Sequence, residues 1–280
     1  MWKSIKAQLY ILFSKKSTWA IWFLMLGAMA VHFIGHVIYY YGYDASYMYN
    51  PLRLVYLGGN NCGSVGFLFM QYYPLIIVLP ASFAYFVDKK SRAIVFLQAR
   101  TDRKKYYISR SISTFTATFI IYALPLYMEL ALNVLAFPVS LNTSIDSDNI
   151  SMLEELYTEH VQKYLFSDLW INNKLVYMLV MIALFGVVTG LLAVFAQCVS
   201  MVFRFKFAVF IFLPVYILLF AVEKIFGSIA SIEWSANYFD YLYLADLSPG
   251  SSAAYIVFMS ALAVVNILMI IYMVRKDEIV

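Results

Sequence analysis

One glutamate and two histidines lie inside long apolar stretches of this sequence, where such ionisable groups are rare and usually functional. Glu129 lies in one stretch, and His32 and His36 lie in another. The two histidines are four residues apart and therefore share one helix face, as two metal ligands do. A third ligand is not evident, so packing or hydrogen bonding between helices is favoured over a metal site. Glu129 is either a functional carboxylate or a group near the membrane interface.

The common catalytic and nucleotide-binding motifs are missing. None of the eleven glycines is followed by Lys, so the chain has no phosphate-binding Walker A loop, and it has no HExxH, GxSxG or CxxC pattern. The basic residues flank apolar stretches and form no separate aromatic and basic patch, which argues against nucleic-acid binding. We therefore expect this chain not to be an enzyme and to hold no cofactor of its own.

The composition indicates an all-α integral membrane protein. Of its 280 residues, 63% are hydrophobic and only 13% are charged, whereas a soluble domain is about 25% charged. Six uncharged stretches approach the roughly 20 residues that a membrane-spanning helix needs. We predict spans at about 19–41, 67–87, 112–136, 175–198, 207–226 and 253–274, which together make residues 19–280 a six-helix transmembrane domain.

Residues 1–18 precede the first span and have an amphipathic pattern. Apolar residues recur at helical spacing and lysines occupy the other positions, which predicts a short helix lying in the membrane interface. A frayed, basic N-terminal leader is the alternative. The apolar positions are Trp2, Ile5, Leu9, Leu12 and Phe13.

The distribution of charge predicts the orientation. If the N-terminus is cytoplasmic, sixteen of the twenty Lys and Arg residues fall on the inner side of the membrane. This asymmetry follows the positive-inside rule and places both termini in the cytoplasm. Residues 137–174 then form the largest loop on the outer side, where they are candidates for a role in cargo selection or gating.

Several uncharged features inside the spans predict contacts between helices. Gly186 and Gly190 form a GxxxG pattern, which allows a second helix to approach closely. Gln197 and Asn266 can pack or hydrogen-bond across helices.

Residues 88–110 are the longest strongly charged segment of the chain. They contain eight of its twenty Lys and Arg residues around a short apolar run, Ala93 to Leu97, that cannot span a membrane. One interpretation is a cytoplasmic loop anchored by positive charge. The other is a docking element for a soluble partner.

The segment resembles the central loop of permease subunits of ABC-2-type exporters. It has the charged start after span two (Asp88 to Arg92), the short apolar helix (Ala93 to Leu97), the polar turn (Gln98 to Asp102) and the Arg-x-x-Tyr-x-x-Ser-Arg start of span three (Arg103 to Arg110). The six spans, the cytoplasmic termini and the amphipathic leader also match this family.

The resemblance implies a function in transport across the plasma membrane of a bacterium. Two permease subunits would pair around a path, and each would dock a separate ATPase subunit, which binds ATP and Mg, through a coupling helix. The coupling residues would be Ala93, Phe96, Leu97, Arg100, Asp102 and Arg103.

The cargo is predicted from the character of the spans. No charged residue lies near the middle of a span, which favours an amphipathic or hydrophobic cargo such as a peptide, a drug-like molecule or a lipid. Two alternatives stay open, a membrane-embedded enzyme acting on lipid or peptide around Glu129 and the histidines, and a non-transporting scaffold or sensor.

Overall fold

The computed structural model describes residues 1–42, 55, 72–91, 94, 96–97, 102–137, 166–203, 205–229 and 252–279. This part of the chain is almost entirely helical and contains no β-strand. The helices are α1 (Trp2–Phe13), α2 (Lys16–Tyr39), α4 (Phe83–Lys90), α6 (Arg103–Ala136), α8 (Ser167–Asn172), α9 (Lys174–Val202), η4 (Ala208–Phe212), α10 (Leu213–Ile229) and α12 (Ser252–Ile279).

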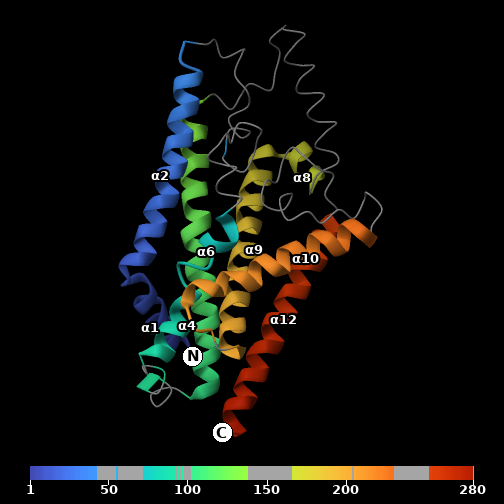
Figure 1. Ribbon diagram of the computed structural model, residues 1–280. Helices are drawn as coiled ribbons and strands as arrows, with labels where there is room; N and C mark the ends of the chain where they lie inside the picture. Colours follow the sequence, from blue (N-terminus) through green and yellow to red (C-terminus); the bar gives the residue numbers. More distant parts are fainter. Residues whose placement is uncertain are drawn as a thin grey trace.

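Four of these helices are long and apolar enough to cross a membrane: α2, α6, α9 and α12. They correspond to the spans predicted at 19–41, 112–136, 175–198 and 253–274. Figure 1 shows them side by side, with the start of α1 and the end of α12 at the same end of the bundle. We call this end the N/C end and the opposite one the far end.

The other two predicted spans do not form single long helices in the described residues. Within 67–87, residues 77–82 form turns around Pro80, and the regular helix α4 starts only at Phe83. Proline has no amide proton and clashes with the preceding turn, so it interrupts the helix here. Within 207–226, the chain forms the short η4 and then α10, which crosses α9 and α12 obliquely in Figure 1.

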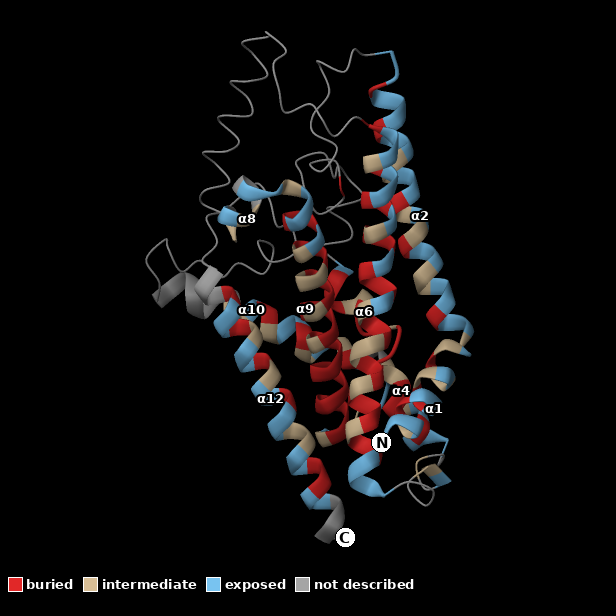
Figure 2. Cartoon of the chain, turned by 180° about the vertical axis from the view of Figure 1, so that it is seen from behind, coloured by how far each residue is buried: buried red, intermediate tan, exposed pale blue. Residues whose placement is uncertain are grey.

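Helix α9 lies at the centre of the bundle. Of its most apolar stretch, 61% is buried, compared with 17% for α2 and 22% for α12. Figure 2 shows the same contrast, with buried residues concentrated on α9 and the facing side of α6. The outer faces of α2 and α12 are exposed, as expected for surfaces that lie against lipid or another subunit.

The GxxxG pattern of α9 packs directly against α6. A Cβ atom on Gly186 would lie 2.8 Å from the Phe119 ring, and one on Gly190 would lie 2.7 Å from the Phe115 ring. Neither distance leaves room for a methyl group, so the two glycines let the helices approach this closely. The predicted close-packing face is confirmed, and its partner is α6.

Polar side chains link these helices within the bundle. Gln197 on α9 accepts a hydrogen bond from Thr114 on α6, and Asn266 Nδ2 on α12 donates to the Leu191 carbonyl at 3.0 Å. Hydrogen bonds between membrane helices contribute about 0.6 kcal/mol on average. The contacts predicted for Gln197 and Asn266 are therefore present.

Helix α1 is the helix predicted in residues 1–18. It packs on the start of α6, and its inward face is formed by Ile5, Gln8 and Leu12. Leu12 contacts Ala84 and Ala117 in a small apolar cluster. The apolar pattern correctly predicted this helix. It did not predict that the polar residue Gln8 is buried on the same face.

Candidate functional site

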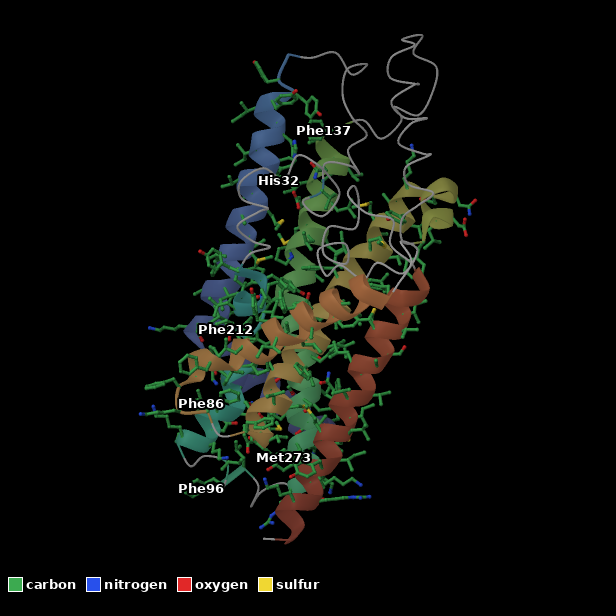
Figure 3. The ribbon with its side chains drawn as sticks, turned by 45° about the vertical axis from the view of Figure 1, so that its right-hand side comes forward. His32, Phe86, Phe96, Phe137, Phe212 and Met273 are labelled. Atoms are coloured by element: carbon green, nitrogen blue, oxygen red, sulfur yellow. The ribbon has the colours of Figure 1, made fainter. Side chains whose placement is uncertain are left out.

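Glu129, His32 and His36, the residues singled out in the sequence, converge at the contact of α2 with α6. Glu129 Oε1 lies 2.5 Å from His32 Nδ1, and His32 Nε2 lies 3.1 Å from His36 Nε2. Glu129 is only 1% exposed. Figure 3 shows His32 between the two helices, in the half of the bundle toward the far end. The side chains form one continuous hydrogen-bonded chain, which we call the Glu–His–His chain.

The spacing of residues on α2 explains why the histidines face α6. The buried residues of this helix are Thr18, Met25, Met29 and His36, which recur every seven or four positions and form one stripe along the helix. His32 lies on the same stripe, between Met29 and His36. The stripe therefore carries methionines in its middle and histidines toward the far end.

Asn133 is a further polar residue beside this chain. It lies four residues after Glu129 and so occupies the same face of α6, one turn nearer the far end. Its side chain is completely buried, and neither amide atom has a hydrogen-bond partner among the described residues. Buried amides are normally paired, so this position suits a water molecule or another small polar group. The sequence analysis did not single out Asn133.

Aromatic rings lie next to the chain on its far-end side. The Tyr40 ring stacks on His36 with centroids 6.5 Å apart, and it packs edge-on against Phe137 at the end of α6. Tyr40 and Phe137 are both buried, with Phe33 beside them. In the part of the chain that the structure describes, no group of three His, Cys, Asp or Glu side chains is arranged to hold a metal ion.

A second buried polar cluster lies at the N/C end. Arg110 Nη2 donates to Asp88 Oδ2 at 2.6 Å and Nη1 donates to Gln8, while the Tyr106 hydroxyl donates to the same Asp88 oxygen at 3.0 Å. Arg110 is completely buried. The cluster connects α1, α4 and α6, and we call it the Asp88–Arg110 cluster.

The sequence analysis counted Arg110 among the charges that anchor the basic loop, but its side chain is buried inside the protein. One feature of the sequence is consistent with this ion pair. The 88–110 segment begins with an acidic residue, Asp88, and ends with a basic one, Arg110. Lys15, at the junction of α1 and α2, is affected by the same cluster. Partial burial and the nearby Arg110 lower the pKa of Lys15 from its ordinary value, and Asp88 acts in the opposite direction.

The predicted coupling residues that the structure describes lie at the N/C end, and they do not share one environment. Phe96 is 73% exposed, and Figure 3 shows it projecting at that end of the molecule. Leu97 is half-buried and packs with Ile94 against a cluster formed by Tyr85, Tyr106, Tyr107, Met201, Met273 and Val274.

The remaining coupling residues divide into two groups. Asp102 and Arg103 are exposed at the start of α6. Ala93 and Arg100 lie outside the described residues. The large loop predicted at 137–174 also lies outside them, except for Phe137 and its last residues from Phe166 on.

Comparison of the chain with known proteins identifies no relative. No protein-family model, curated protein or solved structure matches it.

Proposed function

We propose that this chain is the permease subunit of an ATP-driven exporter of the ABC-2 type. In this proposal it has six spans, both termini are cytoplasmic, and the N/C end faces the cytoplasm of a bacterium. The segments 72–90 and 208–229 would complete the six spans as broken or oblique helices. A separate ATPase subunit would bind ATP and Mg, and a second permease subunit would complete the path.

The observation that carries this proposal is the exposed Phe96 on a segment fixed to the bundle. Its neighbour Leu97 packs against side chains of α4, α6, α9 and α12, so movement of this segment would be transmitted directly to those helices. Phe96 itself is 73% exposed. An exposed aromatic residue surrounded by charges has the composition of a protein-binding hot spot with a polar rim.

We propose different roles for two neighbouring residues of the coupling segment. Phe96 and Leu97 were both predicted as coupling residues from the sequence. With Leu97 packed inside the permease, Phe96 is the anchor that we propose for the partner, and Leu97 is the residue that holds the segment in place. Asp102 and Arg103 are exposed, and we propose that they contribute to the polar rim.

The exposed faces of α2 and α12 suit the other expected neighbours. Both helices leave most of their apolar surface uncovered, which fits contact with membrane lipid and with a second permease subunit. The path between two such subunits would be lined by apolar and aromatic groups, which favours an amphipathic or hydrophobic cargo. We propose a peptide, a drug-like molecule or a lipid.

The proposal is tested by purifying the chain together with an ABC ATPase encoded beside it. Phe96→Asp should reduce the amount of co-purified ATPase at least tenfold, because losing a buried aromatic anchor costs about 2 kcal/mol or more. Tyr41→Asp is the matched control, since Tyr41 is also an exposed aromatic residue (87%) but lies at the far end. An ATPase that stays bound to Phe96→Asp, or that never binds the unaltered chain, would contradict the proposal.

The enzyme alternative has one supporting observation, the convergence of Glu129 with two histidines. Such a carboxylate and imidazole pair could act as a general base toward lipid or peptide. Turnover of these substrates by the reconstituted chain without any ATPase would favour this alternative over the exporter.

A further inference from the structure

The Glu–His–His chain has a simple proton balance. Its two contacts, Glu129 with His32 and His32 with His36, each need one proton between the two atoms. With those two protons alone, the chain carries one negative charge, because a carboxylate is combined with two neutral imidazoles. A third proton on His36 Nδ1 makes the chain neutral, and neither hydrogen bond has to break.

The Glu129 carboxylate favours uptake of this proton, because a negative charge beside an imidazole stabilises its imidazolium form. The chain lies between two membrane-spanning helices, and a net charge buried there costs several kcal/mol unless it is compensated. On the described elements packed around it, the other titratable groups toward the far end are Tyr39 and Tyr40 on α2, Tyr127 on α6, Lys174 and Tyr177 on α9, and Tyr255 on α12. Tyr127 donates its hydroxyl proton to the Leu179 carbonyl, and among these groups only Lys174 is a cation.

We propose that the Glu–His–His chain is a proton-binding site, which takes up one proton through His36 and passes charge along the hydrogen bonds to His32 and Glu129. The proton enters at His36 Nδ1, the proton between the two Nε2 atoms shifts from His36 to His32, and the resulting imidazolium of His32 lies against the Glu129 carboxylate. No bond other than N–H changes, and no further reactant is needed.

The location of the chain gives this proton uptake a structural consequence. His32 and Glu129 belong to different helices, so loading the site converts their contact into an ion pair between α2 and α6. The Glu129 carboxylate is ionised in both states, but in the loaded state it faces a cation, so Coulomb attraction is added to the hydrogen bond. Protonation therefore tightens the contact of α2 with α6, and loss of the proton loosens it. This inference requires only that α2 and α6 span the membrane, and it does not depend on the exporter assignment.

The histidine content of the chain makes a direct test practicable. The protein has only three histidines, and His160 lies outside the described residues, so a His160→Gln background leaves the two histidines of the site. The protein is labelled with ¹⁵N-histidine, reconstituted in lipid bilayers with EDTA to exclude trace metals, and studied by solid-state ¹⁵N NMR between about pH 8 and pH 5, the range in which histidine titrates. Proton uptake appears as conversion of an unprotonated imidazole nitrogen into a protonated one.

We expect uptake of one proton per chain, with the signals of both histidines changing at the same pH. In Glu129→Gln, uptake should require a pH lower by about 1 unit or more, because the adjacent carboxylate charge is gone. In His36→Gln, only the ¹⁵N signal of His32 should change with pH. Lys105→Gln, at an exposed position of α6 near the N/C end, should leave the titration unchanged.

Two results would overturn the inference. One is the absence of proton uptake by either histidine in this pH range. The other is independent titration of the two histidines at a pH that Glu129→Gln does not alter. The measurement involves no ATPase and no cargo, so its outcome is separate from that of the Phe96→Asp experiment.

Discussion

The two buried polar clusters at opposite ends of α6 contain similar groups but differ in their charge balance. In the Asp88–Arg110 cluster, a carboxylate faces a guanidinium that stays protonated at any physiological pH. In the Glu–His–His chain, a carboxylate faces imidazoles, which gain or lose a proton near neutral pH. The first cluster is therefore a fixed connection between α1, α4 and α6. The second can change its charge, and with it the contact of α2 with α6.

The largest expected effect comes from removing the carboxylate charge at the N/C end. Asp88→Asn leaves the Arg110 guanidinium buried without its counterion, which should cost about 3–5 kcal/mol of unfolding free energy. The measurement is reversible unfolding in bicelles. Asp102→Asn is the matched control, because Asp102 is exposed and makes no side-chain capping hydrogen bond.

A double variant separates this explanation from simple loss of packing. In Asp88→Asn combined with Arg110→Met, both charges are gone, and most of the lost stability should return. If the double variant is as unstable as Asp88→Asn alone, an unpaired buried charge is not the cause.

An intermediate effect is expected at the seam between the two clusters, where α9 packs on α6. Gly190→Ala introduces a methyl group 2.7 Å from the Phe115 ring and 3.2 Å from its carbonyl oxygen. Overpacking of this kind costs about 1–3 kcal/mol. The same unfolding measurement applies, and the ¹⁵N-histidine titration should stay unchanged.

Gly27→Ala is the control for this prediction, since a Cβ atom there meets nothing within 4 Å. It should be neutral or slightly stabilising, because alanine favours the helix more than glycine. Equal losses of stability in the two variants would show that close packing at Gly190 is not responsible.

The smallest effect is expected from the same carboxylate-to-amide change at the other end of α6. Glu129→Gln keeps an oxygen that accepts the His32 hydrogen bond. It also removes the carboxylate charge, so that the remaining groups of the chain, a glutamine and two histidines, can all be neutral. The loss should be about 1 kcal/mol, the difference between a charge-assisted and a neutral hydrogen bond. If Glu129→Gln destabilises the protein as much as Asp88→Asn, a fixed cation balances Glu129, and the contrast between the two clusters is wrong.

Most of the helical architecture could be predicted from hydrophobicity alone. A stretch of about 20 apolar residues must form a helix in a membrane, where every backbone polar group needs an internal partner. This constraint is local, so it located α2, α6, α9 and α12. It located the segments 72–90 and 208–229 less well. Turns around Pro80 interrupt the first segment, and the second begins with the short 3-10 helix η4 before α10.

The candidate sites were predicted only as separate residues. Sequence spacing placed His32 and His36 on one helix face, and their presence in an apolar stretch marked them and Glu129 as unusual. Nothing in the spacing indicated that a residue of α6, 97 positions after His32, completes the chain. The burial of Arg110 with Gln8 and Asp88 was likewise hidden, since each of these residues looks like an ordinary interface or loop residue in sequence.

The sequence by itself therefore determined which segments are helical and apolar, and which residues carry unusual chemistry for such segments. The tertiary structure decided which of those residues meet. The physical reason is that hydrophobicity acts on each helix separately, whereas a proton-binding chain or a buried ion pair depends on the rotation and register of one helix against another. In this protein, Gly186 and Gly190 allow the close approach of α9 to α6, and the buried residues of α2 form one stripe that contains His36.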